Sequence, residues 1–273
     1  MEPTLSQVAR YLPFAGGAPP PAARAVAVET PVEIAYGATP FAVMMATPAD
    51  IEDFVTGFSL TEGIVASAAD IRDIKVEAAG EGGSEFLRAS VTLEPGRYAR
   101  LLSRQRNLSG RTGCGVCGIT DAGGLPRAAP VRASRPIALA AIARAGAEMA
   151  RHQPLNDSTR AVHAAALFSR EGGFLLARED VGRHNALDKL VGAAMRAGRA
   201  ADDCFIVVTS RCSFEMVEKA AAFGASTLVA ISAPTSLAIA RANALGVTLH
   251  AIARADGVTQ FTQFPEPETQ DPT

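Results

Sequence analysis

The chain contains no long apolar run, and this absence excludes helices that anchor proteins in membranes. None of its 273 residues falls in a stretch that approaches the roughly 18 uninterrupted apolar residues of a membrane-spanning helix. Residues 1–17 include Glu2, Pro3 and Arg10 and hold no continuous apolar segment, so we expect no secretory signal. We therefore expect a cytoplasmic protein without a membrane partner.

A strong excess of charge of one sign is also lacking. The 26 Lys and Arg residues nearly balance the 28 Asp and Glu residues, which gives a formal net charge of -2 and an isoelectric point near 6.1. Without an overall basic field, we expect no nucleic acid among the partners, and any anionic ligand must be bound by local groups. The hydrophobic content of 48% is enough for the core of one large domain or two modest ones.

Cysteine is scarce, with four residues in the whole chain, and two of them lie close together. In the reducing cytoplasm such cysteines are free thiols, metal ligands or catalytic groups rather than structural disulfides. Cys114 and Cys117 form a CxxC pair in a segment with six glycines between positions 110 and 124. Such a segment can neither pack a core nor hold a regular helix, so the sequence predicts a mobile and accessible pair of thiols.

The residues alone leave three interpretations of the CxxC pair. A zinc site would need Cys204 and Cys212, or histidines, as further ligands, and the seven residues between those two cysteines are not a usual second zinc knuckle. A thioredoxin-type redox pair normally begins a helix directly after a strand, which the flanking glycines disfavour. In the third interpretation the protein is a sulfur carrier, whose one cysteine holds a persulfide while the other assists or protects it.

Turn residues and hydrophobic periodicity divide the chain into five parts. These are a disordered arm at 1–23, a small α+β domain at 24–106, a glycine-rich CxxC loop at 107–131, an α/β domain at 132–265 and a tail at 266–273. The four prolines and two glycines of residues 13–23 indicate the arm. The small domain is predicted to hold hairpins at 32–45 and 71–93, a helix capped by Thr47 that ends near Phe58, and a short helix at 97–106.

The α/β domain is predicted from alternating strands and helices. We expect strands at 162–168, 174–178, 204–209, 227–231 and 247–253, and helices at 137–152, 183–197, 214–223 and 236–245. The last three strands alternate with helices, which favours a mainly parallel sheet covered on both faces. In such sheets a ligand binds beyond the carboxyl ends of the strands.

That rule selects three loops, at 209–213, 232–236 and 254–257. All are rich in hydroxyl groups or contain arginine, and two of them begin helices, whose free N–H groups suit phosphate or another polyanion. The candidate binding residues are Ser210, Arg211, Ser213, Ser232, Thr235 and Ser236. The alternative is that Ser213 and Ser236 only cap their helices.

Two pairs of charged residues lie four positions apart on predicted helices. His184 stacks over Asp188, which is the arrangement of a histidine oriented by a carboxylate for proton relay or of a buried structural hydrogen bond. Glu215 and Lys219 are expected to form an ion pair on a helix surface. His163, taken alone, is expected to be a core histidine.

Five blocks of sequence resemble the FdhD family of formate dehydrogenase accessory sulfurtransferases. They lie at 45–64, 113–118, 179–189, 210–217 and 232–237 and include the CxxC pair, His184 and Arg211. The resemblance implies a cytidine-deaminase-like three-layer core preceded by the small α+β domain, and a homodimer. It also implies a sulfurtransferase that accepts sulfur from a cysteine desulfurase and passes it to the molybdenum of the bis(molybdopterin guanine dinucleotide) cofactor before insertion into formate dehydrogenase.

By the same resemblance, Cys114 would carry the persulfide, Cys117 would support it, and no resident metal or cofactor is expected. The guanine dinucleotide would contact the last predicted loop, formed by Ala253, Arg254, Ala255, Asp256, Gly257 and Val258. His184 is counted with the cofactor-binding residues. The chain departs from the family pattern at Arg160 and Ala161, where the family has two glycines before the strand histidine, which puts close backbone approach to a ligand in doubt and leaves Arg160 as a possible phosphate contact.

Two rival functions remain. A zinc deaminase would share the fold, but His163 is followed by Ala164 and Ala165, so the H-x-E motif with its proton-shuttling glutamate is missing. A cofactor-binding chaperone that transfers no sulfur is the non-enzymatic alternative.

Overall fold

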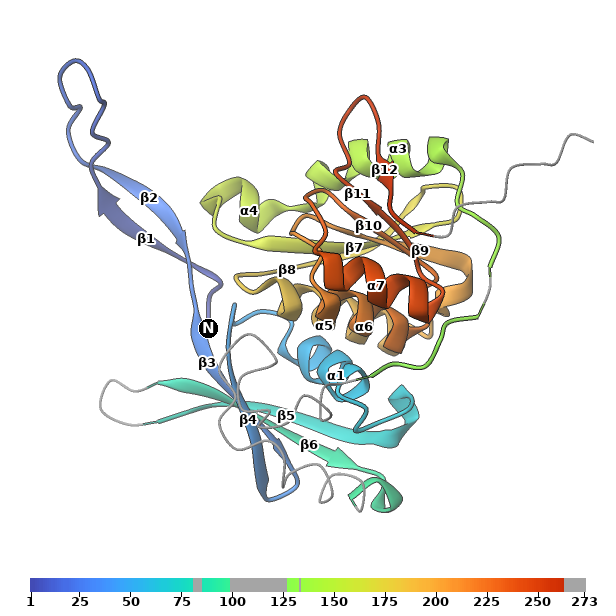
Figure 1. Cartoon of the computed structure of the whole chain (residues 1–273). Coiled ribbons are helices and arrows are strands. Elements are labelled where there is room, and N and C mark those ends of the chain that lie inside the picture. The colour runs from blue at the N-terminus through green and yellow to red at the C-terminus, as the bar shows by residue number, and fades with distance from the viewer. Residues whose placement is uncertain (81–84, 99–126, 133, 263–273) are drawn as a thin grey trace, which may run out of the picture.

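The computed structural model describes residues 1–80, 85–98, 127–132 and 134–262. Cys114 and Cys117 lie outside the described residues, together with most of the predicted loop at 107–131, the predicted tail at 266–273 and most of the helix predicted at 97–106. The described chain forms two main sheets with helices packed between and around them (Figure 1).

The larger sheet has six strands in the order β12-β11-β10-β9-β7-β8. They are β7 (His163–Ser169), β8 (Phe174–Asp180), β9 (Cys204–Val208), β10 (Thr227–Ala230), β11 (Thr248–Ala251) and β12 (Thr259–Gln260). As predicted, β9, β10 and β11 run parallel. The other pairings are antiparallel, so the sheet is mixed and the prediction of a mainly parallel sheet is wrong. The short link at 170–173 between β7 and β8 allows only a hairpin, which reverses the chain.

The reversed strand β7 lies between β8 and β9, and this placement decides what meets at the edge of the sheet. Because β7 is antiparallel to both neighbours, β8 points in the same direction as β9, β10 and β11. The carboxyl ends of these four strands therefore share one edge, and the amino end of β7 joins them there. The helices that follow β8, β9 and β10 all begin at this edge.

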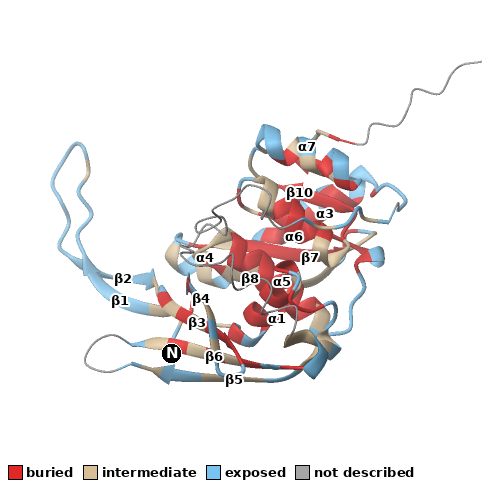
Figure 2. Cartoon of the chain, turned by 60° about the horizontal axis from the view of Figure 1, so that its bottom comes forward, coloured by how far each residue is buried: buried red, intermediate tan, exposed pale blue. Residues whose placement is uncertain are grey.

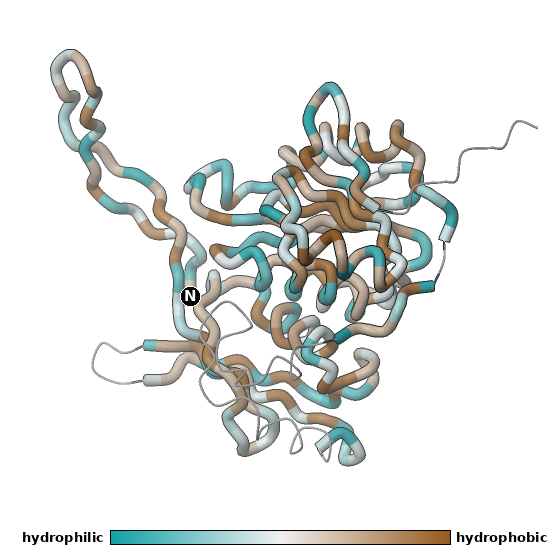
Figure 3. Tube along the Cα trace, in the orientation of Figure 1, coloured by the Kyte–Doolittle hydropathy of each residue, from teal (hydrophilic) through white to brown (hydrophobic). Residues whose placement is uncertain are grey.

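Helices cover both faces of the larger sheet. On one face lie α5 (Arg183–Arg196), α6 (Phe214–Phe223) and α7 (Ser236–Leu245), which pack on strand residues such as Leu167, Ile206 and Leu228. On the other lies α3 (Leu139–Met149), which packs on Phe168 and Phe205. Neighbouring strand residues contribute to opposite cores because side chains alternate across a strand, and Figure 3 shows the hydrophobic strands at the centre.

Some short elements were not predicted. These are α4 (Pro154–Thr159), strand β12 and the 3-10 turns Ala68–Asp70, Pro95–Arg97, Ala150–His152 and Ala201–Asp203. Elements of two to six residues are too short to show a hydrophobic period.

The smaller sheet has the order β4-β3-β6-β5, and the helix α1 (Ile51–Thr61) covers one face. Its strands are β3 (Thr30–Tyr36), β4 (Thr39–Ala46), β5 (Ile71–Ala79) and β6 (Phe86–Leu93). Both predicted hairpins form, and a parallel pairing of β3 with β6 joins them. Helix α1 begins after Asp50, whose backbone is in the left-handed region with φ 54°. Asp50 therefore occupies the cap position, and the prediction that Thr47 caps this helix is wrong.

Helix α1 joins the two sheets because its other side crosses α5 at two glycines. A Cβ added to Gly57 would lie 1.8 Å from the carbonyl oxygen of Asp188, and one added to Gly192 would lie 1.8 Å from that of Asp53. Only hydrogen fits at these positions, which brings the two backbones into direct contact. Figure 2 shows that α1 and α5 lie in the most buried part of the chain.

The N-terminal residues form a ribbon rather than the disordered arm predicted at 1–23. β1 (Thr4–Ala9) and β2 (Ala22–Ala27) pair antiparallel, and the ribbon projects away from both sheets (Figure 1). β2 also crosses the predicted boundary at residue 24. The prolines and glycines that suggested disorder all lie in the segment between the two strands, where they do not interrupt pairing.

Candidate functional site

The three loops selected from the sequence lie side by side at the carboxyl edge of the larger sheet. The backbone N–H of Cys212 donates to Ala233 O at 3.2 Å, and that of Thr235 donates to Cys212 O at 3.0 Å. The N–H of Ile252 donates to Ser232 O at 3.2 Å and attaches the third loop to the second. The edge is therefore a continuous surface built from the ends of β9, β10 and β11.

A cavity of about 690 Å³ opens at this edge on the face covered by α3. The whole predicted cofactor loop, Ala253, Arg254, Ala255, Asp256, Gly257 and Val258, lines it together with Ile231. Its volume is within the usual range for small-molecule sites. The loop holds its shape through an N–H bond from Arg254 to Gly257 O at 2.8 Å, and the Arg254 guanidinium donates to the carbonyl oxygens of Ile231 and Ala253.

The opposite wall of the cavity comes from α3 and was not predicted. It consists of Leu139, Ala140, Ile142, Ala143, Gly146 and Ala147. The sequence does contain a pattern that could have indicated this wall. Small residues lie three and four positions apart, at 140, 143, 146 and 147, so one face of the helix carries only small side chains. That pattern alone does not distinguish a cavity wall from close helix packing.

The hydroxyl groups of the three loops have different structural roles. Thr235, not Ser236, caps α7, since its side chain accepts from the helix N–H three residues on at 3.3 Å. Ser213 occupies the cap position of α6 but makes no capping hydrogen bond. Ser210 is buried and donates to the carbonyl of the next residue at 2.9 Å. Ser232 is half-buried beside the second loop.

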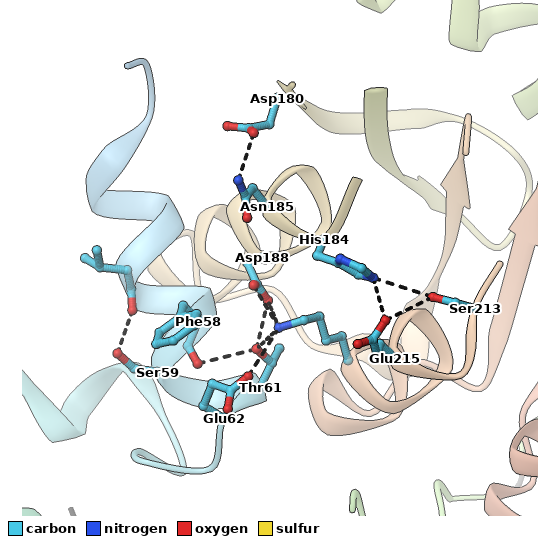
Figure 4. A network of polar contacts seen from close by, with 12 residues as sticks. Phe58, Ser59, Thr61, Glu62, Asp180, His184, Asn185, Asp188, Ser213 and Glu215 are labelled. Atoms are coloured by element: carbon cyan, nitrogen blue, oxygen red, sulfur yellow. Dashed lines mark hydrogen bonds and ion pairs between the residues drawn. The ribbon is translucent and has the colours of Figure 1, made fainter. Parts of the chain in front are cut away.

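The two charged pairs predicted within helices instead form across helices (Figure 4). His184 Nε2 lies 2.9 Å from Glu215 Oε2 and 3.5 Å from Ser213 Oγ. Lys219 Nζ lies 2.8 Å from Asp188 Oδ2. The predicted pairs His184 with Asp188 and Glu215 with Lys219 are therefore wrong. Because α5 and α6 both begin at the same edge and run side by side, equivalent turns face each other, and opposite charges meet between the helices.

The inner of these pairs is a buried polar cluster that extends into α1. Thr61 Oγ1 donates to Asp188 Oδ1 at 2.8 Å, and Lys219 Nζ donates to Thr61 Oγ1 at 2.9 Å. Burial raises the pKa of Asp188, and Lys219 opposes that effect. Glu62 also lies 3.8 Å from Lys219. These charges connect the two parts of the protein rather than face a ligand.

A second buried network uses much of the block at 179–189. Asp180 Oδ2 accepts from Lys189 Nζ at 2.6 Å and from the Thr47 N–H at 3.0 Å, and Asp180 Oδ1 accepts from Asn185 at 3.0 Å. Lys189 also donates to Thr47 O at 2.9 Å. The side chains of Asp180 and Lys189 are fully buried. Thr47 thus joins the smaller sheet to α5, and this part of the motif is structural.

Three basic residues, His163, Arg183 and Arg211, form a group at the edge of the larger sheet. His163 begins β7, pairs in register with the end of β8, and adjoins the start of the loop at 209–213, since Ala164 and Thr209 exchange hydrogen bonds. Arg183 begins α5, and Arg211 lies in the β9–α6 loop. Reasoning from the sequence missed Arg183 and treated His163 as a core residue, because their proximity depends on the reversed direction of β7.

Cys204 and Cys212 are the two cysteines within the described ranges, and both are buried free thiols. Burial raises the pKa of Cys204 to about 11 and that of Cys212 to about 12. Cys204 begins β9 and Cys212 follows its end, so the strand separates them. The two thiols therefore do not combine into the second half of a zinc site.

No group of three or more His, Cys, Asp or Glu side chains in the described ranges is arranged to hold a metal ion.

Among the same residues, no helix is both long enough and apolar enough to cross a membrane.

Comparisons with known proteins agree with one another. Residues 27–267 match the model of the FdhD/NarQ family. The chain is 51% identical over 230 residues to "Sulfur carrier protein FdhD" of Xanthomonas euvesicatoria pv. vesicatoria, which covers 84% of this chain and 80% of that protein. It is 44% identical over 249 residues to the protein of the same name in Agrobacterium fabrum, with 90% of each chain covered.

A solved structure has the same overall fold. The crystal structure of a putative formate dehydrogenase accessory protein from Desulfotalea psychrophila superposes with a TM-score of 0.75 at 27% sequence identity, covering 96% of this chain and 98% of that one. On the family match and these relatives, the chain belongs to the FdhD/NarQ family.

Proposed function

We propose that this protein is a sulfur carrier that accepts sulfur from a cysteine desulfurase on Cys114 and delivers it to the molybdenum cofactor of formate dehydrogenase. The family membership and the names of the relatives support sulfur carriage and an accessory role for formate dehydrogenase. The proposed partners are the desulfurase, the client formate dehydrogenase and, by analogy with the family, a second copy of the chain.

The state of the four thiols carries the proposal. A persulfide carrier needs an accessible thiolate. Cys204 and Cys212 do not meet this need, because they are buried and their pKa values are raised to about 11 and about 12. The other two cysteines of the chain, Cys114 and Cys117, are the glycine-flanked pair.

Loading of sulfur is a thiol exchange. The Cys114 thiolate attacks the terminal sulfur of a persulfide on the desulfurase, so one S–S bond forms on Cys114 while the donor's S–S bond breaks. The donor cysteine leaves as a thiolate. No net oxidation or reduction takes place in this step.

Delivery of sulfide to molybdenum requires two electrons, and Cys117 supplies them with Cys114. The Cys117 thiolate attacks the inner sulfur of the persulfide, a disulfide forms between the two cysteines, and the terminal sulfur leaves as hydrosulfide. Two thiols are oxidised and one sulfur atom is reduced. Cellular thiols then reduce the disulfide. In this scheme, the supporting role of Cys117 is to release the terminal sulfur from Cys114.

The substrate of delivery is the bis(molybdopterin guanine dinucleotide) cofactor, and we assign its guanine end to the cavity lined by Ala253–Val258. The small side chains of α3 leave room for a planar base, and the Asp256 carboxylate is an acceptor for the N–H groups of a guanine. The hydroxyl-rich loops along the same edge extend toward β9, where Ser213 precedes α6.

Intact mass spectrometry after incubation with a desulfurase and cysteine tests the proposal. The wild-type chain should gain about 32 Da, the mass of one sulfur atom. Cys114→Ala should gain nothing, and Cys117→Ala should load sulfur but retain it, because the attacking thiol is absent. Cys204→Ala and Cys212→Ala are matched controls that should load like the wild type. Equal loading of Cys114→Ala and the wild type would disprove the assignment.

The same variant distinguishes a chaperone that transfers no sulfur. Formate dehydrogenase produced with Cys114→Ala should be inactive and short of one sulfide per molybdenum. A fully active and sulfurated enzyme would instead show that the protein only binds the cofactor.

A further inference from the structure

Three basic side chains from three different elements lie near the start of β7, close enough for the two arginines to affect the pKa of the histidine. His163 is the first residue of β7, Arg183 the first of α5, and Arg211 lies just before α6. The register of β7 with β8 places His163 opposite Asp180, three residues before Arg183. Hydrogen bonds between Ala164 and Thr209 place His163 beside the loop that carries Arg211.

Neither arginine of this group has a carboxylate partner within the described ranges. Arg183 Nε is buried and makes no hydrogen bond to the described chain, which is unfavourable for a charged donor. Of the nearby acids, Asp180 binds Lys189, and Glu215 binds His184 through Oε2, while its Oε1 makes no hydrogen bond to the described chain. Neither guanidinium is therefore neutralised by an ion pair with a residue of the described ranges.

Two helix N-termini add to this charge. Gly182 precedes α5 and has no side chain to cap it, and Ser213 precedes α6 but makes no capping hydrogen bond. No side chain in the described ranges makes a capping hydrogen bond to either helix, and both helices direct the positive end of their dipole to this edge.

We infer that His163, Arg183 and Arg211, with the N-termini of α5 and α6, form a binding subsite for a phosphate-class oxyanion, distinct from the cavity lined by Ala253–Val258. The two places are separated along the sheet: the cavity loop follows β11, and the subsite lies around β7. Three strand spacings lie between β11 and β7, or about 14 Å. The identity of its natural ligand rests on the proposed function. In that function, the subsite binds a second phosphate of the extended cofactor.

The subsite couples anion binding to protonation of His163. Burial is the largest cause that lowers the pKa of His163, and the cations Arg183, His184 and Arg211 lower it further, while Asp180 opposes them. A bound anion offsets these cations and raises the pKa of His163. Binding therefore takes up a proton, and the affinity for the anion increases as the pH falls.

Inorganic pyrophosphate is the probe, and NMR of the histidine side chains in the full chain is the readout. The chain has four histidines, so His163→Gln identifies the signal of His163. Pyrophosphate should raise the pKa of His163 saturably, whereas KCl at equal ionic strength should not. An equal effect of KCl, or an unchanged pKa of His163 at saturating pyrophosphate, would overturn the inference.

Two substitutions that are expected to change pyrophosphate affinity in opposite directions test the role of the charges. Arg183→Gln should weaken pyrophosphate binding about tenfold, as expected for loss of a charge-assisted hydrogen bond. Glu215→Gln should strengthen binding several-fold, because it removes a negative charge that lies next to the subsite. The control Arg72→Gln, in the smaller sheet, should change nothing. If both variants of the subsite bind pyrophosphate like the wild type, the assignment is wrong.

Failure of this inference is distinguishable from failure of the proposed function. Pyrophosphate binding is measured on Cys114→Ala as well as on the wild-type chain, since the subsite needs no thiol. Pyrophosphate binding without sulfur loading of the wild-type chain would support the subsite and contradict the carrier role. Sulfur loading without pyrophosphate binding would support the carrier role and contradict the subsite.

Discussion

At the scale of single residues, two ion pairs link α5 to α6, and they differ in their surroundings. His184 and Glu215 lie at the edge of the sheet, next to the N-terminus of α6. Asp188 and Lys219 lie one turn deeper, where Thr61 of α1 completes their hydrogen bonds. The outer pair adjoins a ligand site, and the inner pair contributes to the junction of the two sheets.

The inner pair gives a prediction about stability. Asp188→Ala leaves the Lys219 ammonium buried without its main carboxylate partner, so we expect a loss of about 3–5 kcal/mol in the free energy of unfolding. Urea unfolding followed by circular dichroism measures it. The double variant Asp188→Leu with Lys219→Met removes both charges and should recover much of the loss. If the double variant is as unstable as the single one, the lost stability comes from the ion pair itself and not from the unpaired ammonium of Lys219.

At the scale of elements, the crossing of α1 and α5 determines how close the smaller sheet comes to the larger one. Gly57 and Gly192 face the backbone of the opposite helix, where a methyl group has no space. Ion pairs at the end of the crossing, such as Arg196 with Asp53 at 2.7 Å, depend on that close approach.

Alanine at the crossing should therefore be strongly destabilising. For Gly57→Ala we expect a loss of about 3 kcal/mol or more in the free energy of unfolding, since overpacking outweighs the gain in helix propensity of at most about 1 kcal/mol. Gly146→Ala in α3 is the matched control, because a Cβ there meets nothing within 4 Å. It should raise stability by about 0.5–1 kcal/mol. Similar effects of the two substitutions on thermal unfolding would contradict the close crossing.

At the scale of the whole molecule, the thiols divide into two classes. Cys204 and Cys212 belong to the core that the larger sheet shares with α5, α6 and α7. A reagent can reach them only when that core opens. Their labelling rate therefore reports global stability rather than local chemistry.

Native thiol labelling checks this division. In the variant Cys114→Ala with Cys117→Ala, we expect no fast labelling under native conditions and slow labelling of two thiols at the rate of global unfolding. Raising the urea concentration should accelerate both thiols together. Fast labelling of Cys212 in the folded state would show that the loop at 209–213 opens independently.

Much of this molecule follows from local patterns. In the larger domain, the strands and helices other than α4 and β12 were predicted within a few residues, as were the parallel order of β9, β10 and β11 and the three loops beyond them. Hydrophobic periodicity and turn residues act over short stretches, which makes such elements predictable. The cavity loop Ala253–Val258 was also selected from the sequence, through resemblance to a family. The CxxC pair stays a prediction, since it lies outside the described residues.

The sequence by itself determined which residues share a face of each helix and where the chain turns. Only the tertiary structure decided what each face meets. The spacing of His184 with Asp188 and of Glu215 with Lys219 suggests pairs within helices, but the parallel placement of α5 beside α6 exchanges the partners. Likewise, the hairpin that reverses β7 brings His163 to Arg183. Such contacts join residues far apart in sequence, so they depend on how whole elements pack and not on local spacing.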